Sequence, residues 1–478
     1  MLWLCISLPQ LPLESLRPDA SEELTVVTDC EANARWIICC NAAAERAGLK
    51  VAMSYTTALA IRSEIRMLER KPLAEKAALD RLAAWAYQFS STVIIGEAPP
   101  ELRRARTAAL WLEIGASLKL FGGFRALIEQ LEAALAQLQY TYQLGIAPTL
   151  EGAALLARAG IRIALTTTQA LYARVRQLPV STLAIATEIA EQLHIVGIRT
   201  IGATLEVPRE AIAKRFGPQT SRYLDRLVGL APDPREAFKL PPTYAARFEF
   251  GFEVANTEAL LFPVRRMLRE FAGFLIARDT ATQRFRLTFL HRERAPTELT
   301  IGMSTPERNS ERFFALVREQ LERVILPGPT CELALSAHEF AAPTALQTDL
   351  LTGTVEQGET LSHTIDRLTA RLGDDQVYGI RTVPDHRPEM SWKTVPPDAP
   401  LGAQHRFADR PLWLLPEPKL LQSSALPMHS GPERIESGWW EDNDVQRDYY
   451  IVRTNVGANL WVFRDQRDSN WYLHGFWS

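Results

Sequence analysis

Residues 193–217 read LHIVGIRTIGATLEVPREAIAKRFG and divide the 478-residue chain into regions of different pattern. Gly197 and Gly202 bracket a tight turn between two short helices, and Pro208 opens a further helix that Gly217 closes. The spacing fits a helix-hairpin-helix, whose turn directs backbone N–H groups toward a phosphate. An ordinary turn between two helices with a solvated basic face explains the same pattern. Both interpretations stay open at this point.

Basic side chains gather around this turn, against three acidic ones in the same stretch. The basic residues are Arg199, Arg209, Lys214, Arg215, Arg222 and Arg226, and the acidic ones are Glu206, Glu210 and Asp225. The whole chain has a net charge of −3, so a surface for nucleic acid must be local.

Before this stretch, residues 1–165 alternate strand-like and helix-like patterns and predict an α/β domain on a mixed sheet. The first strand, within WLCISLPQLPLESL at 3–16, is apolar and ends where Pro9 and Pro12 interrupt it. Residues 166–235 are predicted to be helical. A proline-rich linker follows at 231–244.

After the linker, residues 247–345 combine about four strands with two helices and predict a small α+β domain. Arg284 and Arg286 alternate with Phe285 and Leu287, so one face of that strand is predicted to be basic while the other packs. Eight arginines and three acidic residues between positions 262 and 294 indicate a second basic surface.

The C-terminal part divides into a region with little periodicity and an aromatic one. Residues 346–432 are rich in Pro, Thr, Asp and Gly and are predicted to form a flexible tether. Residues 433–478 contain three strand-like runs that suggest a small β-meander. This unit contains Trp439, Trp440, Trp461, Trp471 and Trp477, some of which must form a small core while others face a partner.

Several classes of protein are excluded by composition and motif. The five cysteines form no CxxC pair, which favours a reducing cytoplasm over a disulfide framework. The N-terminus lacks a basic signal-peptide region, and no apolar run is long enough for a membrane span. The scattered histidines form no HExxH motif, and no Walker A or GxGxxG pattern is present. We therefore expect a cytoplasmic protein with no cofactor and no bound metal; association with the nucleoid is implied only by the family resemblance.

The order of these regions resembles Y-family (translesion) DNA polymerases, most closely their ImuB branch. The resemblance implies α/β palm and fingers at 1–165, a helix-hairpin-helix thumb at 166–235 and an α+β little finger at 247–345. CCNAAAERAGLKVAM at 39–53 resembles the fingers segment, and GIRTIGATLEVPREAIAKRFG resembles the thumb. The end of the chain, from GPERIESGWW onward, resembles the C-terminal signature of ImuB-type proteins.

This sequence departs from the family at the positions that bind the catalytic metals and the incoming triphosphate. Active relatives hold two divalent metals with a carboxylate cluster, since hard cations need charged oxygen ligands. The first family Asp falls on Ser7, and the adjacent Asp-Glu pair falls on Ala108 and Ala109 if LWLEI matches the strand after that pair. The Tyr and Arg that grip the triphosphate become Ala42 and Glu45, and a lysine becomes Ala154.

Other carboxylates could stand in for the missing ligands. Glu113 lies on the matching strand, but its family counterpart is not a metal ligand, and Asp29 and Glu31 lie on a predicted turn. A chain with relocated acids would be an active Y-family translesion polymerase. That remains the main alternative to a protein without catalysis.

A short motif directly after the little finger resembles the peptide by which bacterial polymerases engage the sliding clamp. Its residues are Gln347, Asp349, Leu350 and Leu351, in ALQTDLLTG. The glutamine would supply directed hydrogen bonds and the leucines would fill an apolar pocket. Alternatively, the two leucines simply end the packing of the little finger.

Together, the resemblance predicts a non-catalytic mutasome scaffold that binds primer–template or damaged DNA through Gly197, Arg199, Gly202, Lys214, Arg215, Arg284 and Arg286. The implied partners are the sliding clamp, an ImuA/RecA-like protein and an error-prone C-family DNA polymerase. The implied role is translesion synthesis and damage-induced mutagenesis. A third possibility is a general DNA-repair binder with no link to the clamp.

Overall fold

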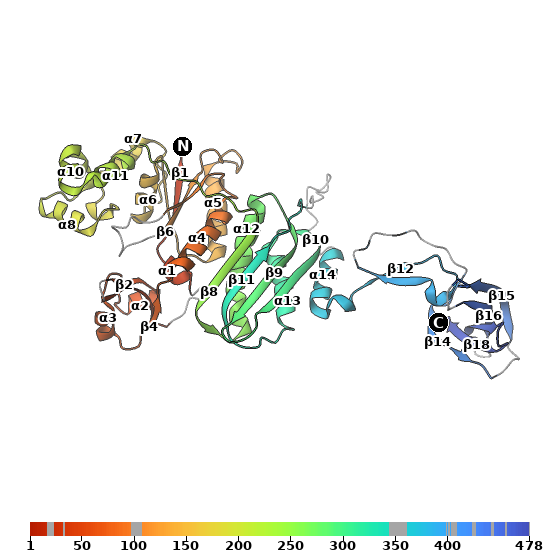
Figure 1. The fold of residues 1–478 in the computed structure, drawn as a ribbon. Coiled ribbons are helices and arrows are strands. Elements are labelled where there is room, and N and C mark those ends of the chain that lie inside the picture. The colour runs from red at the N-terminus through yellow and green to blue at the C-terminus, as the bar shows by residue number, and fades with distance from the viewer. Residues whose placement is uncertain are drawn as a thin grey trace. The chain divides into compact units, whose positions relative to one another are not determined.

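A computed structural model describes the chain except residues 17–22, 32–33, 97–107, 344–360, 398, 400–401, 403–408, 423–426, 441–443, 455–456 and 478. The chain forms two compact units, Met1–Gly358 and Glu359–Ser478 (Figure 1). The predicted multidomain class, with α/β and α+β parts and a β-rich C-terminal region, is confirmed.

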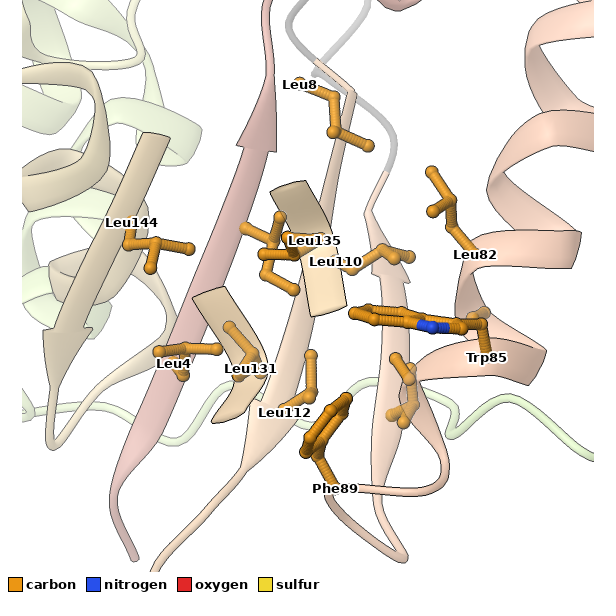
Figure 2. Close-up of a cluster of buried hydrophobic side chains, with 14 of the residues drawn as sticks. Leu4, Leu8, Leu82, Trp85, Phe89, Leu110, Leu112, Leu131, Leu135 and Leu144 are labelled. Carbon is orange, nitrogen blue, oxygen red and sulfur yellow. The ribbon is translucent and has the colours of Figure 1, made fainter. Parts of the chain in front are cut away.

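A four-stranded antiparallel sheet forms the palm-like region. Its strands are β5 (Val93–Gly96), β6 (Ala108–Glu113), β1 (Trp3–Leu8) and β7 (Gln143–Ala147), in that order. Helices α4 (Pro72–Ala86) and α5 (Phe124–Leu138) pack on one face through leucines spaced by four residues, such as Leu131 and Leu135. Figure 2 shows Leu4 of β1 and Leu110 and Leu112 of β6 facing the same cluster as Trp85 of α4.

The opposite face of this sheet packs on helix α6 (Leu150–Arg158) and on helices of the thumb-like region. Alternation along β1 assigns its residues to the two faces, with Leu4 and Ile6 on the α4 side and Cys5 on the α6 side. The strand therefore has no solvated face, which explains its continuous apolar sequence.

A separate three-stranded sheet forms the fingers-like region. Its order is β3 (Ala34–Cys40), β2 (Thr25–Glu31) and β4 (Arg66–Glu69), with β2 antiparallel to β3 and parallel to β4. Short helices α1 (Leu11–Glu14), α2 (Ala42–Arg46) and α3 (Tyr55–Ile61) accompany it. One mixed sheet was expected for 1–165; two sheets form because the turn and helix α1 at Pro9 and Pro12 separate β1 from β2.

The predicted helical region at 166–235 is confirmed as helical. It contains α7 (Thr168–Val175), the 3-10 turn η2 (Val180–Thr182), α8 (Thr187–Ile195), α9 (Ile201–Glu206), α10 (Arg209–Phe216) and α11 (Pro218–Val228). Leu193, Ile201 and Leu224 join the core on the α6 face of the palm-like sheet.

The little-finger-like region is a four-stranded antiparallel sheet with two helices, as the sequence predicts. Its strand order is β10 (Thr297–Glu307), β9 (Thr282–His291), β11 (Thr330–Ala337) and β8 (Tyr244–Val254). Helices α12 (Thr257–Ala277) and α13 (Ser310–Leu321) pack together, with Phe271 and Phe313 stacked 5.6 Å apart.

Buried polar contacts join helix α12 to the palm-like region. The Arg81 guanidinium of α4 donates to the Glu270 carboxylate at 2.7 Å, and Tyr140 donates to the same carboxylate at 3.0 Å. Both charged side chains of this pair are buried. Gly273 lies under Trp85, where an added Cβ would approach the indole to 2.3 Å.

The second unit has more structure than the sequence predicts. The expected tether at 346–432 contains helix α14 (Leu361–Leu372), the short turns η3 (Asp374–Gln376) and η4 (Pro388–Met390), and the hairpin of β12 (Gly379–Thr382) and β13 (Trp392–Val395). β14 (Trp413–Leu420), also within that range, pairs with β18 (Trp471–Phe476). The expectation was wrong because β12 and β13 have only four residues each and β14 contains Pro416 and Pro418.

The C-terminal sheet has five strands rather than three. Its order is β14, β18 (Trp471–Phe476), β17 (Asn459–Asp465), β16 (Val445–Arg453) and β15 (Met428–Ser437). β15 to β18 form the predicted meander, and β14 adds an edge. Across the described residues of both units, no helix combines the length and apolarity needed to cross a bilayer.

Candidate functional site

The palm positions where metal ligands are expected to be missing lie side by side. Ser7 of β1 pairs with Ala109 of β6, and the next pair in the register is Leu8 with Ala108. Ser7 and Ala109 are 3% and 6% exposed, and Ala108 is half-buried. The fold therefore brings these positions together, and they present no carboxylate oxygen to a cation.

Trp111 fills the same sheet face two residues further along β6. It pairs with Cys5, and its indole lies so close to Gly96 that an added Cβ there would be 1.7 Å from the ring. The indole N–H donates to the carbonyl oxygen of Leu150 at 2.8 Å. This face is therefore packed with side chains, and burial raises the pKa of the Cys5 thiol to about 12.

Arg235, from the linker, covers Trp111 with its guanidinium 4.7 Å from the ring centroid. The guanidinium also donates to Glu151 at 2.5 Å and to Asp233 at 2.7 Å. Burial raises the pKa of Glu151, and Arg235 opposes that rise. These two carboxylates are thus engaged by a protein cation at the palm face.

Glu113, the possible substitute ligand, holds a turn together instead. Its carboxylate accepts hydrogen bonds from the backbone N–H groups of Leu2, Gly115 and Ala116 at 2.9, 3.1 and 3.1 Å. It also lies at the other end of β6 from Ala109, opposite Trp3. Its role in this structure is a cap for backbone donors.

The other candidate acids do not assemble into a cluster. Asp29 lies 3.3 Å from the Arg70 guanidinium, which also donates to Glu75 at 2.6 Å. The side chain of Glu31 lies outside the described part of the chain. Within the described residues, no group of three or more His, Cys, Asp or Glu side chains could hold a metal ion.

The two expected triphosphate positions lie on one exposed side of α2. Ala42 and Glu45 are three residues apart, so they share a helix face, and both are exposed. The Glu45 carboxylate places negative charge on this exposed side of the helix. Ala154 is buried within α6 and reaches no ligand surface.

The turn between α8 and α9 differs from the expected one at Gly202. Gly197 has φ +86°, the left-handed conformation that favours glycine in a turn. Gly202 instead lies inside α9 and is buried, with an added Cβ 2.9 Å from the Arg176 carbonyl oxygen. Placing it at the edge of the turn was wrong, because its small size serves close packing of α9 against this backbone.

Backbone donors at the start of α9 are already used. The N–H of Ile201 donates to the Leu178 carbonyl at 2.9 Å, and that of Gly202 donates to Arg176 at 3.1 Å. These two donors are therefore not available to a phosphate.

The basic side chains of the thumb-like region fall into two groups. Arg209 is held by Asp225 at 2.7 Å. Arg199, Lys214 and Arg215 are exposed and form no ion pair within the described residues. This second group presents positive charge to solvent.

On the little-finger-like sheet, Arg284 and Arg286 are exposed while Phe285 and Leu287 are buried, as their alternation predicts. Arg286 lies 3.3 Å from Glu298 of β10, and Arg284 forms no ion pair within the described residues. The basic part of this sheet face is therefore small.

Three other arginines between 262 and 294, all on α12, are engaged by partners within the fold and do not add to the expected second basic surface, whereas Arg292 and Arg294 are exposed. Arg265 and Arg269 both pair with Glu311, and Arg266 donates to the carbonyls of Glu14 and Gln139. A count of charges along the sequence misses these contacts because the partners are distant in the chain.

The five C-terminal tryptophans separate by exposure. Trp439 and Trp440 are 81% and 60% exposed and meet edge to face at 5.3 Å. Trp461 is buried and stacks on Tyr449, so its assignment as a partner-binding residue is corrected to a core role. Trp471 and Trp477 are half-buried.

Two exposed tryptophans were missed. Trp392 and Trp413 are 50% and 59% exposed and lie on β13 and β14. Both fall in the range interpreted as a tether, and the short strand patterns around them were the available signal. The clamp-like residues Gln347, Asp349, Leu350 and Leu351 lie outside the described residues.

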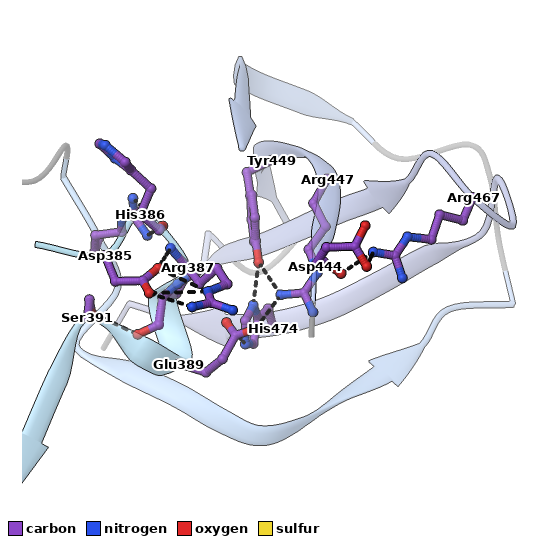
Figure 3. Close-up of polar contacts among 12 residues, drawn as sticks. Asp385, His386, Arg387, Glu389, Ser391, Asp444, Arg447, Tyr449, Arg467 and His474 are labelled. Atoms are coloured by element: carbon purple, nitrogen blue, oxygen red, sulfur yellow. Dashed lines mark hydrogen bonds and ion pairs between the residues drawn. The ribbon is translucent and has the colours of Figure 1, made fainter. Parts of the chain in front are cut away.

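A buried polar cluster fixes the C-terminal sheet, as Figure 3 shows. Tyr449 Oη lies 2.7 Å from His474 Nδ1, and Arg447 donates to the same hydroxyl at 3.2 Å and to Glu389 at 2.9 Å. Burial lowers the pKa of His474 to about 4, against the opposing charge of Glu389. Burial thus favours the neutral imidazole, whose tautomer decides whether Tyr449 or His474 donates in this contact.

Known proteins provide an independent comparison. The model of the impB/mucB/samB family matches residues 13–158. Protein ImuB from two strains of Caulobacter vibrioides is 27% identical over 468 residues, which cover 90% of this chain and 99% of the relative. These findings confirm the resemblance that the residues predicted: the chain is similar to ImuB over most of its length, and its N-terminal part is similar to the impB/mucB/samB family.

Solved structures give a looser match. DinB from Sulfolobus solfataricus is 13% identical, with a TM-score of 0.40, covering 72% of this chain and all of that one. An insertion ternary complex of Dbh DNA polymerase is 12% identical, with a TM-score of 0.41, covering 70% of this chain and 98% of that one.

Proposed function

We propose that this chain is a non-catalytic, Y-family polymerase-like scaffold of a bacterial mutasome. The observation that carries the proposal is the pairing of Ser7 with Ala109, buried beside Trp111. Its role would be to hold DNA and the sliding clamp while a recruited error-prone polymerase performs translesion synthesis and damage-induced mutagenesis.

The physical argument concerns the metals. Two divalent cations in phosphoryl transfer stabilise the attacking and leaving oxygens, and both need charged oxygen ligands. The residues at the matching positions offer one buried hydroxyl and two methyl groups. The nearby acids Glu151 and Asp233 are held by Arg235, so a cation would have to displace an internal ion pair.

DNA contact is assigned to phosphate recognition by exposed cations. Arg199, Lys214 and Arg215 of the thumb-like region, with Arg284 of the little-finger-like sheet, are exposed and free of internal ion pairs among the described residues. Contacts of this kind position a protein on DNA without reading its sequence, and they depend strongly on salt.

The link to the clamp is assigned to Gln347, Asp349, Leu350 and Leu351, on sequence resemblance. A pull-down with purified clamp tests it: changing Gln347, Leu350 and Leu351 to alanine should abolish retention while DNA binding persists. Retention by this variant would favour the general DNA-repair binder that has no clamp link through this motif.

Partner recruitment is assigned to the exposed pair Trp439 and Trp440. Large aromatic side chains with polar edges are common energetic anchors of protein interfaces. The proposed partners are an ImuA/RecA-like protein and an error-prone C-family polymerase. Trp439→Ala with Trp440→Ala should weaken their capture, whereas Lys419→Ala on the exposed edge strand should not.

Primer extension by the purified chain with Mg²⁺ or Mn²⁺ tests the central claim. We expect no incorporation under conditions where the chain still binds the primer–template. Incorporation that co-purifies with the chain and disappears in Glu151→Gln or Asp233→Asn would favour the alternative, an active polymerase with relocated carboxylates. Glu113→Ala is a poor test because it removes a backbone cap.

A further inference from the structure

Strand β8 departs from the little-finger-like sheet over a short stretch near its end. Its pairing with β11 is interrupted between Glu249 and Val254, where one residue of β11, Cys331, faces residues 250–253. Such a β-bulge bends a strand and redirects its side chains. β8 is an edge strand of its sheet, so this stretch, which we call the β8 bulge, has no neighbouring strand on its outer side in the described part of the chain.

The β8 bulge contacts the fingers-like region. The backbone N–H of Gly251 donates to the Leu16 carbonyl oxygen at 3.1 Å. An added Cβ on Gly251 would lie 3.1 Å from Leu68 of β4, so the absence of a side chain allows this close approach. Leu16 and Leu68 belong to one buried cluster, which also contains Val27 of β2 and Cys39 of β3. The bulge therefore contacts residues that form a core of the fingers-like region.

Two cations of the fingers-like region contact aromatic and acidic side chains of β8. The Arg66 guanidinium lies over Phe252, 4.4 Å from the ring centroid. It also pairs with Glu23 at 2.9 Å, which orients it within the fingers-like region. Lys71, which follows β4, forms an ion pair with Glu249. These two contacts lie on either side of the bulge glycine along β8.

We propose that the β8 bulge is a latch that holds the fingers-like sheet against the little-finger-like sheet, so that the two regions move as one body. Among the described residues the fingers-like sheet shares no strand with the palm-like sheet, so side-chain packing and this latch determine its position. A fixed position suits α2, whose exposed Ala42 and Glu45 provide no cation that would hold a phosphate. The latch goes beyond the function proposed above and is tested in the chain alone.

The test measures a distance between the two regions in the full chain. Cys30 of β2 is an exposed free cysteine, and Ile325→Cys adds a second labelling site at a position of the little-finger-like region that is 94% exposed. Cys331→Ser removes the half-buried thiol of β11, and the other three cysteines are buried. Double electron–electron resonance between two spin labels should give one narrow distance distribution, which duplex DNA leaves unchanged.

Three variants identify the contacts that hold the latch. Lys71→Glu with Phe252→Ala removes the ion pair and the ring contact, and a second distance should appear. Adding Glu249→Lys restores an ion pair with reversed charges and should return the distribution toward a single distance. The matched control is Lys76→Glu with Phe252→Ala, because Lys76 pairs with Asp80 of its own helix at 2.9 Å. In the control, the second distance should be less populated than in the Lys71 variant.

Thermal midpoints confirm that each variant is folded. Where Phe252→Ala lowers the midpoint, Lys71→Glu alone, its charge swap with Glu249→Lys and Lys76→Glu provide the same comparison.

Three results would overturn the proposal. Two distances in the unmodified chain would show that the regions already move independently. One unchanged distance in the Lys71→Glu, Phe252→Ala variant would show that other contacts hold the fingers-like region. A different distance in the presence of duplex DNA would show that the two regions separate when DNA binds.

Discussion

The palm-like sheet and the thumb-like region both contain residues that the sequence predicts to have a function, but the two sets differ in burial. In the palm-like sheet, two positions matched to metal ligands of active relatives are buried. Ser7 and Ala109 pair with each other on a sheet face that Trp111 and Arg235 fill. At the thumb, Arg199, Lys214 and Arg215 remain exposed and free of ion pairs among the described residues. The predicted residues of the palm-like sheet pack in a core, whereas those of the thumb-like region expose positive charge to solvent.

Under the proposed function, this difference separates catalysis from binding. Metal ligands act only at short range and in fixed geometry, so the small residues at the matched positions could not hold a metal. Phosphate contacts tolerate displacement, because screened charge acts over about 8–10 Å at ordinary salt. A scaffold role needs only the second property.

The largest expected effect tests whether the palm face is truly a packed core. Trp111→Ala removes a buried indole together with its hydrogen bond to Leu150 and its contact with Arg235. We expect a loss of about 3–5 kcal/mol in the free energy of unfolding, measured by urea denaturation. Trp439→Ala, at an exposed position, is the control and should change it by less than about 0.5 kcal/mol. Similar small losses in both variants would contradict the packed face.

The next test restores a carboxylate at the palm. Ala109→Asp places an unpaired charge at a position that is 6% exposed, and we expect a loss of about 3 kcal/mol in stability. The half-buried neighbour Ala108→Asp should lose less. Mg²⁺ should rescue neither variant; a rise in the thermal midpoint of Ala109→Asp with Mg²⁺ would show that the face still accepts a metal.

A third test extends the comparison to the C-terminal sheet, where the ionisable side chain of His474 is buried in the core. Because the pKa of His474 is about 4 when folded and about 6.5 when unfolded, the unfolded state binds more protons between these values. The stabilising contribution is complete above about pH 6.5 and is lost as the pH falls toward 4. At pH 5 the loss should reach about 2 kcal/mol.

Hydrogen exchange of β16 to β18 at pH 7 and pH 5 measures this loss, with rates corrected for intrinsic pH dependence. His474→Gln should flatten the dependence while leaving a side chain near Tyr449. An equal pH dependence in this variant would assign the effect to another group.

The smallest expected effect concerns the thumb. Lys214→Ala with Arg215→Ala should weaken binding of duplex DNA roughly tenfold and reduce the salt slope by about 0.9 for each lost phosphate contact. The free energy of unfolding should not change, because both side chains are exposed. Lys419→Ala in the other unit is the control. An unchanged salt slope in the double variant would remove these residues from the proposed DNA surface.

Sequence reasoning succeeded where local periodicity and burial agree. The strand at Trp3–Leu8, the leucines of α5 and the alternation of Arg284 with Phe285 were all readable, since each depends on neighbours within a few residues. The adjacency of Ser7 and Ala109 followed from matching two strands to a known family. It could not have come from spacing alone.

The errors arose where partners are distant in the chain. Gly202 was placed in a turn because its contact with Arg176 is tertiary. The arginines of α12 looked like a surface because Glu14, Gln139 and Glu311 lie far away in sequence. Helix α14 was missed although its apolar residues recur at helical spacing, because it lies within a longer range whose Pro, Thr, Asp and Gly content dominated the interpretation.

The buried contact between Arg81 and Glu270 affects how the first unit folds during synthesis. It joins residues 189 positions apart, and it closes only when the little-finger helix has left the ribosome. Until then the growing palm carries an unneutralised arginine and an uncovered Trp85. Long-range closure of this kind is slow and makes distant segments fold together. We therefore expect residues 1–343 to melt in a single cooperative transition, with palm and little finger inseparable as folding units.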